Sequence, residues 1–122
     1  MIHVSVIHVN VSNNFFVTKN DICQDLVDLG LKTGDLLMVH SSLSSIGFVE
    51  GGAKTIVDCL LDVVGNEGTL VVPTFTYPSA YTGSADKMWV FDPASTNSGV
   101  GSITNEVIRR SNSRRSIHLW HS

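Results

Sequence analysis

The chain has 122 residues, of which 43% are apolar and 16% charged, and its formal net charge is −3. This length suits a single domain near the small end of the usual range, and the apolar content excludes a disordered tail. Every apolar run is shorter than the roughly 20 residues that cross a bilayer. The first residues lack the basic start of a secretory leader, so we expect a cytoplasmic protein without a membrane span.

Charge is distributed unevenly along the chain. All 11 carboxylates and the four lysines precede Arg109, whereas the four arginines lie within positions 109–115. Such an arginine cluster fits either a solvated helix end or an anion site. Nucleic-acid binding is not expected, because the rest of the chain is acidic and has no long basic stripe.

The first predicted elements are a helix and a strand. Residues 2–9 alternate between apolar and polar side chains, which fits a strand or an irregular extension. Thr18 and Asp21 form a variant of the capping box at a helix start. The apolar positions that follow recur at helical spacing: Ile22, Leu26 and Leu29. Residues 36–39 form a short apolar run that is typical of a buried strand.

A second helix carries Ile56, Leu60 and Val63 on one face and is followed by another apolar run at 69–72. The order strand, helix, strand is a βαβ unit, so the two strands should be parallel. We therefore predict an α/β fold with a mostly parallel sheet and flanking helices, as an incomplete part of a larger fold. A long loop over residues 78–97 and a short helix over 102–110 complete the prediction.

Neither the cysteines nor the histidines of the sequence predict a reactive or metal-binding site. Cys23 and Cys59 each sit in an apolar helical pattern and are predicted to be buried free thiols. His118 and His121 are three residues apart, but a metal site needs a third ligand and none is placed nearby. We therefore predict no metal.

The hydroxyl-rich segment 40–47 is the first candidate site. It follows a predicted strand, and ligands of open α/β sheets bind beyond the carboxyl ends of strands. Ser41, Ser42, Ser44 and Ser45, with the helix start near Gly52, suit a phosphate or a pantetheine chain, although helix capping explains them equally well. The hydroxyls and aromatic rings of residues 73–77 should lie at the same edge of the sheet.

A phosphate-loop motif is excluded in this region. Gly47 and Gly52 have the spacing of its two glycines, but Ala53 separates Gly52 from Lys54. One extra residue rotates the lysine by about 100° around the helix. Lys54 would then not point at the phosphates.

Several blocks in order resemble the aminoglycoside N3-acetyltransferase family. They cover residues 39–47, 49–53, 65–76 and 115–122, and the last reads Arg-Ser-Ile-His-Leu-Trp-His-Ser. Each block alone is unspecific, whereas their order and spacing fit from about residue 16 onward. The resemblance implies an α/β fold in which 16–122 form the N-terminal part of the acetyltransferase domain and 1–15 an extension.

The resemblance also implies the reaction and its residues. An acetyl group would pass from acetyl-CoA to the 3-amino group of the 2-deoxystreptamine ring of an aminoglycoside. The CoA side would be lined by Ser41, Ser42, Leu43, Ser44, Thr74, Arg115, Ser116, His121 and Ser122. The polycationic acceptor would be attracted by the acidic body of the chain, where the candidates are Glu50, Tyr77, Asp86 and Asp92.

The catalytic base is not assigned to this chain. In the family, a histidine held by a carboxylate serves as general base. Family members are considerably longer, so that segment is expected beyond Ser122, and His121 is the alternative within the chain. Leu119 stands where family members often have proline, which points to a different local turn. Residues 1–122 alone are therefore expected to bind CoA weakly and not to acetylate.

Two other functions are compatible with the same residues. One is a truncated, non-catalytic remnant that binds CoA weakly or not at all, and the other is an acyltransferase for a different amine. A downstream reading frame with a histidine and a nearby carboxylate would favour the enzyme, and an immediate stop codon the remnant. The sequence specifies neither the aminoglycoside nor the oligomeric state.

Overall fold

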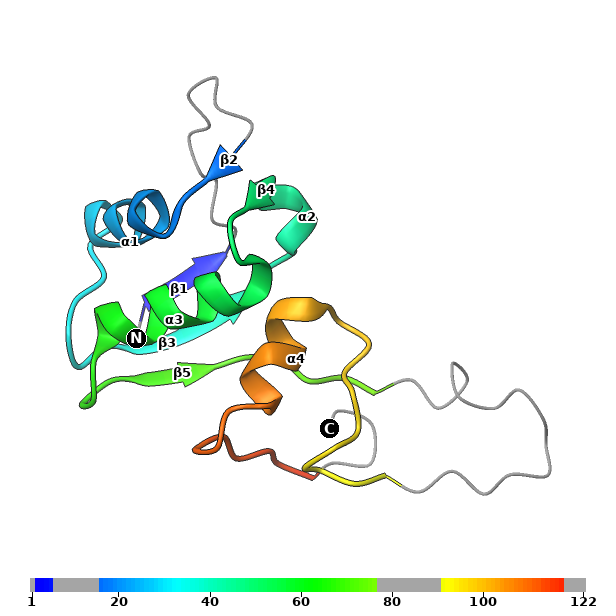
Figure 1. Ribbon diagram of the computed structural model, residues 1–122. Coiled ribbons are helices and arrows are strands. Elements are labelled where there is room, and N and C mark those ends of the chain that lie inside the picture. The colour runs from blue at the N-terminus through cyan, green and yellow to red at the C-terminus, as the bar shows by residue number, and fades with distance from the viewer. Residues whose placement is uncertain (1, 6–15, 77–90, 118–122) are drawn as a thin grey trace.

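The computed structural model describes residues 2–5, 16–76 and 91–117. Its main sheet contains three parallel strands in the order β1 (Ile2–Ser5), β3 (Leu36–His40) and β5 (Thr69–Val71) (Figure 1). In this register Leu37 lies opposite both Ile2 and Leu70. Because β3 and β5 are parallel and joined through a helix, the predicted α/β fold with its βαβ unit is confirmed.

The pairing of β1 with β3 resolves the alternatives of strand or irregular extension for residues 2–5. Residues 2–5 belong to the main sheet, as a strand. Residues 6–15 lie outside the described part of the chain. The division of the chain at residue 16 stays a prediction.

Helices α1 (Lys19–Asp28) and α3 (Gly52–Val64) contact each other and bury their apolar side chains with strand β3 (Figure 1). Helix α1 begins with the predicted capping box, in which Asp21 N–H donates to Thr18 Oγ1 at 3.3 Å and Thr18 N–H donates to the Asp21 carboxylate at 2.9 Å. The side chains buried completely or almost completely in this core are Ile22, Leu26, Leu37, Val39, Ile56, Val57, Cys59, Leu60 and Val64.

Residues 36–39 form the predicted strand, but the predicted burial holds for only every second residue. Leu37 and Val39 are buried, but the alternate residues Leu36 and Met38 remain 43% and 37% exposed. The core formed with α1 and α3 reaches only one face of β3, and successive strand residues point to opposite faces. Leu29, the last residue of the predicted helical spacing, caps the end of α1 and is exposed.

A second, smaller pair of parallel strands was not predicted. Strand β2 (Phe16–Val17) pairs with β4 (Phe48–Val49), which follows the single turn of α2 (Leu43–Ile46). The rings of Phe16 and Phe48 meet edge to face, with centroids 5.0 Å apart. Two-residue strands are too short to show alternation, so the sequence pattern could not reveal this pair.

Helix α4 (Ser102–Ile108) packs against α3, as Figure 1 shows. It ends two residues before the predicted boundary at Arg110. The segment 91–101 leads into α4 through a turn at residues 93–95, and the rest of the predicted long loop lies outside the described residues. None of the described helices is long and apolar enough to cross a membrane.

Both cysteines are free, as predicted, although Cys23 is only half-buried. The Cys59 thiol donates a hydrogen bond to the Lys19 carbonyl at 3.2 Å, and burial raises the pKa of this thiol to about 12. Since the thiolate is the reactive form of cysteine, Cys59 should be inert at neutral pH.

This inertness can be measured in a variant that carries only Cys59. In Cys23→Ser protein at pH 8, we expect a disulfide reagent to label Cys59 far more slowly in the folded state than in urea. The opposite variant, Cys59→Ser, retains the partly exposed Cys23 and should label faster when folded. Equal labelling rates for the two folded variants would contradict the burial of Cys59.

Candidate functional site

The first candidate site lies where two neighbouring strands end. Strands β3 and β5 are parallel, with Met38 opposite Val71, so the segments after His40 and Val71 emerge at the same end of the sheet. From the sequence, Ser41–Ser44 were expected next to Thr74 and Thr76 at one edge of the sheet. Their direct contact stays a prediction, whereas the shared edge is confirmed. It follows from the parallel pairing alone.

The serine loop, residues 41–45, presents several hydroxyls at this end of β3. Ser42 precedes α2 but makes no side-chain capping bond, and its hydroxyl instead lies 2.8 Å from that of Ser44. Leu43, between them, turns inward and packs against the core. The exposed Ser42 and Ser44 hydroxyls are therefore not consumed by helix capping, which the sequence had left as an alternative.

The start of α3 is held by its own side chains. Thr55 Oγ1 donates to the Glu50 carbonyl at 2.6 Å, and Gly51 adopts a φ of 77°. Lys54 Nζ contacts Asp58 one turn further along the helix at 2.7 Å. This orientation of Lys54 agrees with the exclusion of a phosphate loop.

Arg115 links three segments of the chain. Its Nε donates to Thr74 Oγ1 at 3.1 Å, and its Nη2 donates to the Thr74 carbonyl at 2.7 Å and to Thr76 Oγ1 at 2.9 Å. Its Nη1 donates to the Thr96 carbonyl at 2.6 Å. The guanidinium also lies over the Phe91 ring, 4.9 Å from the centroid. A bond from Arg115 to a CoA phosphate would have to compete with these internal bonds.

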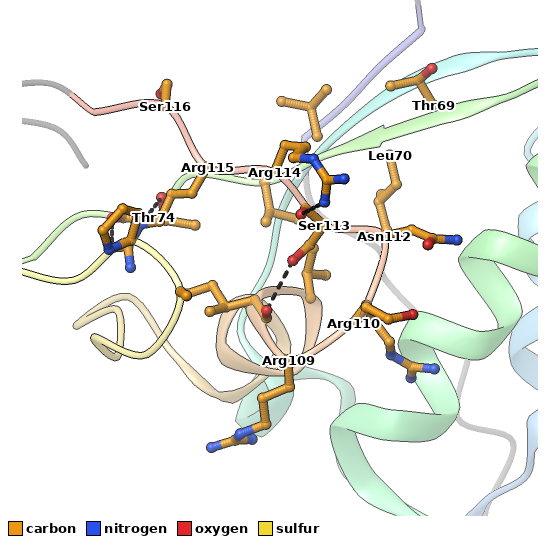
Figure 2. A pocket seen from close by; sticks show the side chains of 17 residues that line it. Thr69, Leu70, Thr74, Arg109, Arg110, Asn112, Ser113, Arg114, Arg115 and Ser116 are labelled. Carbon is orange, nitrogen blue, oxygen red and sulfur yellow. Dashed lines mark hydrogen bonds between the residues drawn. The ribbon is translucent and has the colours of Figure 1, made fainter.

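A groove of about 980 Å³ lies between strand β5 and the segment that follows α4. Residues 69–72 and Thr74 form one wall, and residues 107–116 form another, with Pro93 and Ala94 also lining it. Figure 2 shows Thr74 beside Arg115 at this groove, with Ser116 on the same segment. The serine loop does not line the groove, so the predicted CoA-side residues fall into two groups, one at the end of β3 and one beside β5.

Comparison with known proteins identifies the family to which the chain belongs. A sequence model described as aminoglycoside 3-N-acetyltransferase matches residues 38–122, which include the serine loop, Thr74 and Arg115. The chain belongs to this family.

Individual members of the family agree with this assignment. Aminoglycoside N(3)-acetyltransferase III from Salmonella sp is 39% identical over 113 residues, covering 83% of this chain and 40% of the relative. The crystal structure of YokD from Bacillus subtilis superposes with a TM-score of 0.74 at 35% identity, covering 86% of this chain and 48% of that one. A structure named AAC-IIIb binary with CoASH has a TM-score of 0.64 at 25% identity, covering 79% and 40%.

The chain spans only part of these acetyltransferases. It covers 20% of the Micromonospora chalcea relative, aminoglycoside N(3)-acetyltransferase IX, and 40% of the Salmonella one.

The other arginines of this acetyltransferase-family chain are half-buried or exposed. Arg110 Nη1 and Nη2 lie 2.8 Å from Asp58 and 2.8 Å from Glu106, so Arg110 ties the end of α4 to α3. Arg109 and Arg114 are exposed beside the groove. Within the cluster, Arg110 is bound to carboxylates of the chain, and Arg109 and Arg114 leave positive charge exposed beside the groove. The anion site, one of the two alternatives from the sequence, stays a prediction.

The predicted acceptor-binding residues are only partly placed. Glu50 is exposed at the turn before α3. Asp92 accepts bonds from the Ser95 hydroxyl and from Ala94 N–H at 3.0 Å, and these bonds hold the pKa of its carboxyl below the ordinary value. Tyr77, Asp86, His121 and Ser122 lie outside the described residues. The acceptor role of this set stays a prediction.

A polar link between the segment that follows β5 and helix α4 was not predicted from the sequence. The Ser98 hydroxyl donates to the Phe75 carbonyl at 3.1 Å, and the Asn105 side chain exchanges bonds of 2.7 and 3.0 Å with the Ser98 backbone. The one clue in the sequence was Asn105 itself, because asparagine within a helix often bonds to nearby backbone. This link fixes the segment that carries Thr74 and Thr76.

Proposed function

We propose that the protein containing these residues transfers the acetyl group of acetyl-CoA to the 3-amino group of the 2-deoxystreptamine ring of an aminoglycoside. The observation that carries the proposal is the family match over residues 38–122, which includes the serine loop, Thr74 and the block from Arg115 onward. The CoASH complex of a relative supports CoA as the second ligand.

The two groups of hydroxyls supply polar partners for a CoA molecule. Ser42 and Ser44 lie beyond the carboxyl end of β3 and Thr74 beyond that of β5, and Ser116 lines the same groove as Thr74. All four offer hydroxyls as hydrogen-bond partners. Amide and thioester carbonyls of the acyl-pantetheine chain need donors, and a buried carbonyl without one costs about 1–3 kcal/mol. We assign these residues to CoA binding, and no metal to the site.

The chemical step is attack of the 3-amino nitrogen on the thioester carbonyl carbon. The new C–N bond forms, the C–S bond breaks with CoA leaving as the thiolate, and the amine proton passes to a general base. The described residues are assigned to binding and positioning, and the base stays a prediction outside them.

The test is an assay of thiol release from acetyl-CoA by the intact protein. We expect release that depends on an aminoglycoside such as kanamycin or gentamicin, with the product acetylated at the 3-amino group. Release that requires a simple amine instead would favour the alternative acceptor. No release with either, combined with no CoA binding, would favour the remnant.

Acidic residues should contribute to acceptor binding through charge. Neutralising Glu50 or Asp92, as Glu50→Gln or Asp92→Asn, is expected to raise KM for the aminoglycoside about 2- to 5-fold at low salt, as for exposed charge pairs. The effect should shrink at high salt because exposed charges are screened. Glu67→Gln, in the exposed turn before β5, is the matched control. Equal KM values for all three variants would remove the acidic residues from the site.

A further inference from the structure

The chemistry of arginine fixes the direction of the bonds around Thr74. A guanidinium has N–H donors and no acceptor. In the 3.1 Å contact between Arg115 Nε and Thr74 Oγ1, the threonine oxygen must therefore accept. A hydroxyl carries one proton in addition to its acceptor positions, so the Thr74 proton is directed toward an acceptor other than Arg115.

The same arginine also fixes where Thr74 lies. Arg115 Nη2 donates to the Thr74 carbonyl at 2.7 Å, so the backbone and the side chain of one residue are held by one guanidinium. Nη1 joins this unit to the Thr96 carbonyl at 2.6 Å. Bonds from a charged donor are stronger than neutral ones, and the planar fork holds several acceptors in a fixed geometry.

Thr74 stands at a position where a ligand can be reached. It follows β5 at the carboxyl end of the parallel sheet, and it is partly exposed and lines the groove (Figure 2). Oriented donors near a reacting carbonyl stabilise the negative charge that develops on its oxygen. The proposed co-substrate carries such oxygens in its thioester and its pantetheine amides.

We infer that Arg115 is a positioning residue that presents the Thr74 hydroxyl as a hydrogen-bond donor to a carbonyl oxygen of the acyl-pantetheine chain of acetyl-CoA. The inference rests on the proposed function and deepens it. It gives Arg115 a role different from the direct CoA contact expected from the sequence, because its hydrogen bonds serve Thr74, Thr76 and Thr96.

The test is a double-mutant cycle in the intact protein with Thr74→Val, Arg115→Lys and the combined variant. Valine keeps the shape of threonine without the hydroxyl, and lysine keeps the charge without the fork. Each single variant should lower kcat/KM for acetyl-CoA about 3- to 10-fold, the usual value of one hydrogen bond. The combined variant should lose little more than Thr74→Val alone, because both changes remove the same interaction.

Further variants separate this role from a loss of folding. Thr74→Ser should recover most of the activity, and KM for the aminoglycoside should stay constant throughout. Thr33→Val, at an exposed turn, is the matched control and should leave the kinetics unchanged. If Arg115→Lys fails to fold, Arg115→Gln keeps two N–H donors and completes the cycle.

The outcomes distinguish the inference from the proposed function. Normal turnover by Thr74→Val, or strictly additive losses in the combined variant, would overturn the inference and leave the proposed function intact. An unaltered protein that neither binds CoA nor releases thiol would overturn both. If affinity for free CoA falls as much as acetyl-CoA turnover, the acceptor is an amide carbonyl of the pantetheine chain. If only acetyl-CoA turnover falls, the acceptor is the thioester carbonyl. Either result supports the inference.

Discussion

Replacing Leu60 with alanine is expected to lower the free energy of unfolding by about 2–5 kcal/mol. Leu60 lies in α3, its side chain is fully buried, and it belongs to the core shared by α1, α3 and β3. The substitution removes the transfer free energy of the lost carbons and leaves a cavity that the neighbouring side chains fill only partly. Urea unfolding followed by circular dichroism measures the change.

The next residue provides the control. Leu61 is also in α3 but is 39% exposed, so Leu61→Ala is expected to change the free energy of unfolding by less than about 1 kcal/mol. Two equal losses would mean that the face of α3 that packs on the sheet is assigned wrongly.

Helix α3 shows which parts of the fold the sequence could predict. Ile56 and Leu60 recur at helical spacing, and Thr18 with Asp21 marks the start of α1; both signals depend on residues a few positions apart. Parallel pairing of β3 and β5 then followed from the helix between them. Each of these inferences uses local patterns, and each is confirmed.

The errors arise where distant segments decide the outcome. Leu36 and Met38 looked buried because they are apolar, but their exposure depends on which face of the sheet the helices cover. Strands β2 and β4 pair across 32 positions with two residues each, which no periodicity reveals. A short apolar run is therefore a weaker guide to burial than to strand formation.

The candidate site, like the fold, was predictable from the sequence only in part. The edge of the sheet that Ser41–Ser44 and Thr74 share was predictable from parallel strands, but the internal hydrogen bonds of Arg115 were not. Its bonds reach residues 19 to 41 positions away. From composition alone an arginine beside Ser116 looks like an anion ligand, and only the folded arrangement shows what its guanidinium already binds.

Replacing Arg110 with methionine is expected to lower the free energy of unfolding by about 1–3 kcal/mol near neutral pH, because hydrogen bonds to charged groups are lost. Arg110 contacts Asp58 and Glu106 at 2.8 Å each, and the two carboxylates have side chains only 25% and 19% exposed. Methionine keeps much of the length of the side chain, so the change isolates the charge. The partly buried carboxylates of Asp58 and Glu106 would then lose the positive charge that offsets the cost of their burial.

The pH dependence gives this prediction its sign. The bond from Lys54, followed by the contact with Arg110, holds the pKa of Asp58 below its ordinary value. A lowered pKa contributes stability above the unfolded-state pKa, about 4, and this contribution is lost as the pH falls through the folded-state value. The difference between the unaltered protein and Arg110→Met should therefore be largest above about pH 5 and should shrink in more acidic solution. Arg109→Met is the control, since Arg109 is 64% exposed and lies 3.9 Å from Glu106. A gap that is independent of pH, or an equal loss in Arg109→Met, would show that α4 is held to α3 by apolar packing and not by the charge of Arg110.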